Sequence, residues 1–194
     1  MLKKLLLLIW ISAALYAQHD ASINLNNDEI ELKGNLDIGE MNESDYPDTY
    51  FLTLGFLDVD NDESTDPMFE AGLMLRQNIE AVEGLRFGLG LKGTYTEVAN
   101  SDHAAIPLGA ELEYTLPFVF SMPIKLKGAL FYAPSVLSFK DADGYSEGRI
   151  ELSIDIVEQA TLFVGYRNIE TDFDGYRGDY TYTDKGYIGA KVRF

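Results

Sequence analysis

Apolar residues recur at every second position over most of this chain. In residues 29–39, Ile30, Leu32, Leu36 and Ile38 alternate with mainly charged or polar residues. An extended strand sends successive side chains to opposite faces, so this period predicts strands with one apolar and one polar face. The same alternation marks eight further ranges: 50–57, 68–77, 85–95, 106–115, 124–132, 149–155, 161–167 and 187–194. The sequence therefore predicts an all-β protein.

Turn-forming segments separate most of these strands. They are rich in Gly, Pro, Asn, Asp or Ser, and they cover residues 40–49, 58–67, 80–84, 100–102, 117–123, 134–144 and 172–179. No long stretch repeats apolar residues with the helical period, and we find no internal repeat or linker. A short run at 22–25, followed by a tight turn, supplies a tenth strand. We expect one domain over residues 18–194.

A soluble β-sandwich and a transmembrane β-barrel both show this alternation. The predicted strands approach the roughly 9–11 residues that a tilted strand needs to cross a bilayer, whereas soluble strands average about five or six. Aromatic residues near several strand ends suit the membrane interfaces: Tyr50, Tyr95, Tyr114, Tyr132 and Tyr166. We therefore expect a closed antiparallel transmembrane β-barrel of ten strands. Eight strands is the alternative, with part of the N-terminal region outside the wall.

Charged side chains of both signs occupy the polar faces of the predicted strands. A narrow lumen requires such mixing, because an unpaired charge enclosed there is costly. A ten-stranded barrel is just wider than the eight-stranded size that side chains fill, so we favour a filled lumen over a small polar pore. The expected lumen charges are Glu70, Arg76, Arg86, Lys92, Glu111, Glu113, Lys125, Lys127, Glu147, Arg149, Glu151, Asp155, Arg167, Lys191 and Arg193.

The N-terminus has the form of a secretory signal peptide. Lys3 and Lys4 precede an apolar run at 5–15, which is too short for a spanning helix. Cleavage after Ala17 is expected, with Ala14 as the runner-up and an uncleaved anchor as the alternative. Removal of residues 1–17 changes the net charge from −17 to −19. No later segment has 18 consecutive apolar residues.

The last strand resembles the assembly signal of bacterial outer-membrane barrels. It runs from Tyr187 to Phe194, and such signals end in an aromatic residue. Val192 stands where a further aromatic residue is frequent. If both ends of the chain lie in the periplasm, the segments 58–67, 134–144 and 172–179 are expected at the outer surface of the cell. The short turns 80–84 and 157–159 are then expected on the periplasmic side. The segment 40–49 is long for a periplasmic turn.

Composition excludes several classes of function. The net charge of −17 argues against nucleic acid as a partner. The absence of cysteine excludes a disulfide framework, a thiol nucleophile and a cysteine-ligated metal, and two histidines cannot form a three-histidine metal site. We expect no cofactor.

An acidic run in the segment 58–67 is the one candidate metal site. Asp58, Asp60 and Asp62 resemble the start of a calcium loop, but Glu63 and Phe69 stand where an EF-hand needs Gly and Glu. A looser site that attracts Ca²⁺ or Mg²⁺ and bridges to lipopolysaccharide is one interpretation. A solvated, self-repelling loop is the other, which we favour.

Two other motifs have simple structural explanations. Gly88, Gly90 and Gly93 match a dinucleotide fingerprint by letter, but no helix follows them. The run 101–103, Ser-Asp-His, holds the residue types of a hydrolytic triad and is similar only loosely to small lipid-modifying barrel enzymes. Neighbouring residues rarely adopt triad geometry, so we expect no catalysis, with an outer-membrane lipid hydrolase or acyltransferase as the alternative.

Several segments together resemble the YfaZ family of bacterial outer-membrane proteins. They are the signal peptide, the acidic segment after residues 55–57, the glycine-rich strand at 85–95, the stretch 129–134 and the terminal strand ending in Phe194. The resemblance implies an outer-membrane barrel, described as porin-like, with no catalytic residues to transfer. The expected role is structural or that of a narrow pore, and an acidic-loop binding module is a further alternative. Outer-membrane lipid, lipopolysaccharide, periplasmic chaperones and the barrel assembly machinery are the expected partners.

Overall fold

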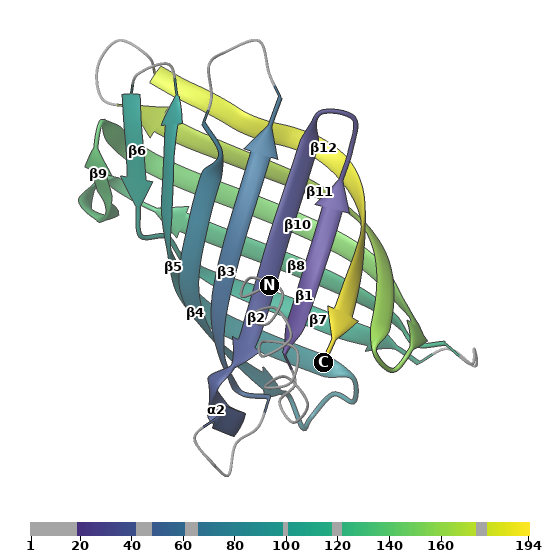
Figure 1. The fold of residues 1–194 in the computed structure, drawn as a ribbon. Helices are drawn as coiled ribbons and strands as arrows, with labels where there is room; N and C mark the ends of the chain where they lie inside the picture. Colours follow the sequence, from purple (N-terminus) through teal and green to yellow (C-terminus); the bar gives the residue numbers. More distant parts are fainter. Residues whose placement is uncertain (1–18, 42–47, 61–65, 99–100, 118–121, 174–177) are drawn as a thin grey trace, which may run out of the picture.

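The computed structural model describes residues 19–41, 48–60, 66–98, 101–117, 122–173 and 178–194. Within them, ten antiparallel strands form a closed barrel, since β1 pairs with β12 and β4 pairs with β5 (Figure 1). The ten strands are β1 (Asp20–Leu25), β2 (Glu29–Asp37), β3 (Tyr50–Val59), β4 (Met68–Asn78), β5 (Leu85–Val98), β7 (Leu108–Leu116), β8 (Ile124–Ala133), β10 (Ala142–Val157), β11 (Ala160–Phe173) and β12 (Gly178–Arg193). The ten-stranded prediction is confirmed.

The two ends of the described chain meet where the barrel closes. The six residues of β1 pair with β12 from Asp20 opposite Arg193 to Leu25 opposite Ile188. Beyond this ladder, the His19 and Phe194 backbones exchange two hydrogen bonds of 3.1 and 2.9 Å. We call this end of the barrel proximal and the opposite end distal. The strand ends at 59 and 68, at 133 and 142, and at 173 and 178 all lie distally, whereas the turns after β4 and β10 are proximal.

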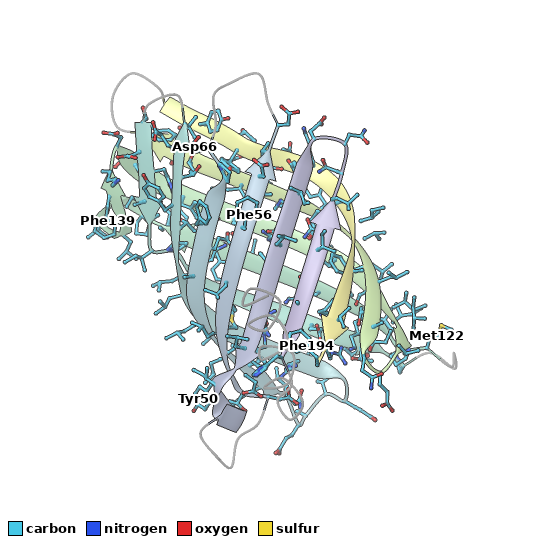
Figure 2. The ribbon with its side chains drawn as sticks, viewed as in Figure 1. Tyr50, Phe56, Asp66, Met122, Phe139 and Phe194 are labelled. Carbon is cyan, nitrogen blue, oxygen red and sulfur yellow. The ribbon has the colours of Figure 1, made fainter. Side chains whose placement is uncertain are left out.

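The outer surface of the barrel is apolar and its interior is polar. Leu89, Leu112 and Leu152 are 50%, 47% and 47% exposed, although they lie in the middle of their strands. Glu31 and Arg167 are buried at 1% and 0% exposure. A sandwich would bury the leucines and expose the charges, so the structure has the arrangement of a membrane-spanning barrel. Figure 2 shows the apolar side chains projecting from the wall.

No helix among the described residues has the length and apolar character needed to cross a membrane. The one α-helix within the described ranges, α2, is the four-residue segment Ile38–Met41, where the sequence predicted the end of a strand and the start of a long turn. The rest of that turn, at 42–47, lies outside the described residues. So does the predicted signal peptide at 1–17.

The last three strands are about twice as long as predicted. β10, β11 and β12 have 16, 14 and 16 residues, and the β10–β11 ladder continues to Ala142 opposite Phe173. Their distal ends reverse the alternation: in β11, Ile169 and Phe173 point inward and are buried, whereas Glu170 points outward and is exposed. The inward side chains are apolar here because they pack on one another rather than bordering a polar lumen.

Two short strands lie outside the ten-stranded cylinder, in segments predicted as loops or turns. β6 (Ser101–Ala105) pairs with the distal part of β5, whereas the proximal part of β5 pairs with β7. β9 (Ser138–Lys140) pairs with β6 and follows the 3₁₀-helix η1 (Ser135–Leu137). The predicted strand 106–115 therefore begins at Leu108, because Pro107 has no backbone N–H and interrupts the ladder between β6 and β7.

Candidate functional site

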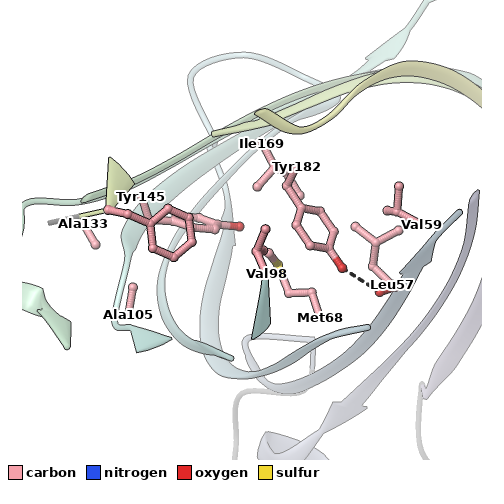
Figure 3. Packing of buried hydrophobic residues seen from close by; sticks show 10 residues of the cluster. Leu57, Val59, Met68, Val98, Ala105, Ala133, Tyr145, Ile169 and Tyr182 are labelled. Carbon is pink, nitrogen blue, oxygen red and sulfur yellow. Dashed lines mark hydrogen bonds between the residues drawn. The ribbon is translucent and has the colours of Figure 1, made fainter. Parts of the chain in front are cut away.

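The lumen is the candidate functional site, and an apolar cluster fills its distal end (Figure 3). The cluster draws on eight strands and consists of Leu57, Val59, Met68, Val98, Ala105, Ala133, Tyr145, Ile169, Phe173 and Tyr182. Its polar atoms have partners: the Tyr182 hydroxyl donates to the Asp66 carbonyl at 2.9 Å, and the Tyr145 hydroxyl donates to Glu147 at 2.6 Å.

His103 adjoins this cluster from β6, one of the two strands outside the ten-stranded cylinder. Its side chain is fully buried, with its ring centroid 5.7 Å from that of Tyr145 and 6.0 Å from that of Phe173. Neither ring nitrogen makes a hydrogen bond of ordinary geometry within the described part of the chain. Burial lowers the pKa of His103 from 6.5 to about 4, so the imidazole is neutral at pH 7.

Below the cluster, a network of ion pairs crosses the lumen. Glu31 accepts two hydrogen bonds from Arg149, at 2.9 and 2.6 Å, and its Oε2 lies 2.8 Å from Nη1 of Arg167. Arg167 also donates to Glu29 at 2.6 Å. β2 thus supplies the carboxylates, and β10 and β11 on the other side of the β1–β12 closure supply the guanidinium groups.

The network continues to the strands on the opposite wall. Glu147 accepts from Arg149 at 2.5 Å and also pairs with Lys92. Lys92 in turn donates to Glu70 at 2.6 Å, and Lys33 lies 3.5 Å from Glu70. Opposite charges therefore alternate across the barrel. Their mutual attraction compensates the free-energy cost of removing these charges from water.

The proximal part of the lumen holds separate ion pairs, and two adjacent cavities lie there, the first of which extends to the central network. Glu111 pairs with Arg76 and, at 2.9 Å, with Lys127, and Lys125 lies 2.7 Å from Asp155. The cavities measure about 130 and 160 Å³. They share seven lining residues: Asp20, Asn35, Arg76, Glu111, Glu113, Lys127 and Lys191.

The structure places all the expected lumen charges on the inner face. Fourteen of the fifteen line a cavity or belong to the network, and Asp155 pairs with Lys125 at the proximal rim. The sequence prediction did not include Glu29, Glu31 and Lys33, although Glu31 is the centre of the network. The alternation in residues 29–39 already assigned these three residues to the polar face of their strand. That pattern was enough to add them to the predicted lumen charges.

The three triad-type residues do not come together. Asp102 points outward, where it accepts hydrogen bonds from Tyr95 at 2.8 Å and from Lys140 at 2.9 Å. His103, the next residue, points inward, as successive strand residues must. Gly88 is an ordinary strand glycine: a Cβ there would lie 2.5 Å from Cγ of Glu111, so glycine makes room for that side chain.

The other predicted positions lie at the two ends of the barrel. Asp58 and Asp60 are exposed distally, Asp62 lies outside the described residues, and no three acidic or histidine side chains within the described ranges are grouped to hold a metal. Tyr187 points inward and donates to Glu151 at 2.7 Å, and Phe194 lies at the proximal end against His19. Their role as an assembly signal stays a prediction.

A family comparison agrees with this architecture. The model of the YfaZ family, described as YfaZ precursor, matches residues 6–194. The chain belongs to the YfaZ family. The search of curated proteins finds no match.

Solved structures similar to this YfaZ member include three outer-membrane proteins. A bacterial polysaccharide outer membrane secretin has 12% identity and a TM-score of 0.45, covering 90% of this chain and 69% of its own. The NanC porin has 10% identity and a TM-score of 0.44, covering 92% and 100%. The outer membrane protein Omp33 of Acinetobacter baumannii has 8% identity and a TM-score of 0.39, covering 93% and 100%.

Proposed function

We propose that this chain is a structural β-barrel of the bacterial outer membrane whose lumen is closed to solutes. The apolar cluster at the distal end carries the proposal. Ten buried side chains from eight strands meet there, and all but two are 0–2% exposed. The cavities of about 130 and 160 Å³ are lined by residues of the proximal and central lumen.

The membrane placement rests on the wall. An exposed belt of Leu, Ile and Val surrounds a barrel in which every strand is paired on both sides. Hydrocarbon cannot hydrogen-bond backbone groups, so a strand-built span must close in this way. The expected signal peptide directs such a chain out of the cytoplasm, and the outer membrane is where closed bacterial barrels reside.

The ionic network supports a closed state. Moving a solute through the central lumen requires separation of pairs such as Glu31–Arg149 and Glu147–Lys92, whose side chains are 1–8% exposed. Separating a buried pair costs about 3–5 kcal/mol. The proximal cavities favour a narrow pore as the second candidate, in which the distal cluster would have to move.

Conductance across a planar lipid bilayer separates the two candidates. We expect the refolded chain to insert without stepwise current. The double variant Met68→Ala/Tyr182→Ala, which removes two large members of the cluster, is expected to produce current steps. The matched control Leu89→Ala/Leu112→Ala removes two side chains from the outer surface and should stay silent. Stepwise current from the unmodified chain would refute the closed barrel and support the pore.

The expected partners follow from this placement. Phospholipid and lipopolysaccharide contact the belt, and periplasmic chaperones and the barrel assembly machinery deliver the chain. The proposal includes no catalytic step and no cofactor.

A further inference from the structure

The segment 134–141 forms an arm on the outer flank of the barrel. It consists of η1 and β9, and β6 is the single partner of β9 among the strands that the structure describes (Figure 1). Two of its apolar side chains are exposed: Val136 is 78% exposed and Phe139 is 47% exposed. Figure 2 shows Phe139 on this flank, away from the lumen.

Several interactions hold the arm against the wall. The Ile106 amide donates to the Leu137 carbonyl at 2.8 Å, and the Asp141 amide donates to the Asp102 carbonyl at 3.1 Å. Leu137 packs against the apolar cluster inside the barrel. Val136 and Phe139 are therefore held on the exposed side of the arm, because Leu137 between them points toward the apolar cluster.

The arm continues the aromatic surface of the barrel. Strand register aligns Phe56, Phe69, Tyr95, Ala104 and Phe139 in one row across β3, β4, β5, β6 and β9. All five belong to the outward face. Leu130 and Tyr132, 71% and 61% exposed, belong to the outward face of β8, the strand that leads into the arm.

We propose that the arm docks into lipid, with Val136 and Phe139 at the boundary between acyl chains and headgroups of the distal leaflet. The inference rests on the proposed membrane placement. Lipid is the occupant that continuity favours, because the row of aromatic residues begins on the wall that faces hydrocarbon. Aromatic residues favour this boundary. Lys140 suits it as well, since its ammonium lies 4.6 Å from the centroid of the Tyr95 ring and 2.9 Å from Asp102.

Tryptophan reporters test the docking directly. Trp10 is the single tryptophan, so in a Trp10→Phe background each introduced tryptophan is the sole reporter. The reporters are Val136→Trp in the arm, Leu152→Trp in the middle of the belt and Asp143→Trp at an exposed distal position. Each variant is folded into phosphatidylcholine vesicles that carry bromine, a fluorescence quencher, at a defined depth along the acyl chain.

Each outcome has a distinct meaning. We expect Val136→Trp to emit at shorter wavelength than Asp143→Trp and to lose most intensity with bromine near the headgroups, whereas Leu152→Trp responds most to deep bromine. If Leu152→Trp is quenched and Val136→Trp behaves like Asp143→Trp, the docking inference is wrong and the membrane placement stands. Blue-shifted but unquenched emission from Val136→Trp would mean that protein covers the arm, which also overturns the inference. Absence of quenching at Leu152→Trp would contradict the membrane placement itself.

Discussion

Acidification should destabilise this barrel through His103. The side chain is fully buried in the apolar cluster without a hydrogen-bond partner for either nitrogen in the described structure, and burial lowers its pKa from 6.5 to about 4. In the unfolded chain the imidazole binds a proton first as the pH falls. The folded state therefore loses the contribution of His103 to its stability between pH 6.5 and about 4, and this contribution changes no further below the lower value.

The size of the effect follows from the same pKa difference. At about 1.4 kcal/mol per pKa unit, lowering the pKa from 6.5 to about 4 corresponds to roughly 3 kcal/mol. His103→Phe keeps an aromatic ring of similar size beside Tyr145 and Phe173 but cannot titrate. Asp172 acts in the opposite direction, because burial and the nearby Asp179 raise its pKa, but it is present in both proteins and cancels in the comparison.

Urea unfolding in detergent micelles, followed by circular dichroism, measures the effect. The unmodified chain should lose about 3 kcal/mol more than His103→Phe between pH 7 and pH 4. Equal pH dependence of the two proteins would refute the reasoning, since it would mean that the imidazole is already accessible to protons in the folded state. A smaller loss of stability in the unmodified chain than in His103→Phe would show that the predicted direction of the His103 effect is wrong.

Three further substitutions test the lumen, the wall and the belt by urea unfolding, the first two in detergent micelles and the third in lipid vesicles. Arg167→Met removes the buried cation that pairs with Glu29 and one of the two guanidinium groups that pair with Glu31, and it should cost about 3–5 kcal/mol. Lys185→Met at an exposed pair should cost less than about 1 kcal/mol. Similar losses would show that the network is solvated. Gly109→Ala places a Cβ within 2.5 Å of the Leu130 carbonyl oxygen and should cost about 1–3 kcal/mol. Gly93→Ala places its Cβ 3.8 Å from the Ala71 carbonyl oxygen, an ordinary van der Waals contact, and should be nearly neutral. If both are neutral, the wall is looser than described. Leu152→Arg should cost about 2–4 kcal/mol in vesicles, and a neutral result there would mean that the belt faces water.

The sequence anticipated the barrel well because most of the wall separates hydrocarbon from a polar interior. Strands such as β2 and β4 keep one alternation from end to end, and it is visible without any tertiary information. The prediction failed at the distal ends of β10, β11 and β12. At these distal ends the inward face is apolar and the outward face is polar. The alternation of apolar and polar residues therefore changes phase, and the sequence pattern predicts a loop instead of a strand.

The candidate site was predicted in part. Alternation alone assigned Arg149 and Arg167 to the lumen, but the residues that pair with them are over a hundred positions away, in β2. Such pairs depend on how the cylinder closes between β1 and β12, which local pattern does not record. The burial of His103 likewise depends on the pairing of β6 with the distal part of β5, which brings its ring against Tyr145 of β10 and Phe173 of β11.

Period-two patterning by itself determined that this chain is all-β and that its leucines and its charges occupy opposite faces of the strands, because side-chain direction in a strand is a local property. Tertiary structure alone decided which charges meet, that the distal lumen is filled by apolar side chains, and that residues 134–141 form an arm on the flank. These features arise from contacts between strands distant in sequence, and such contacts form only when the sheet curves and closes on itself.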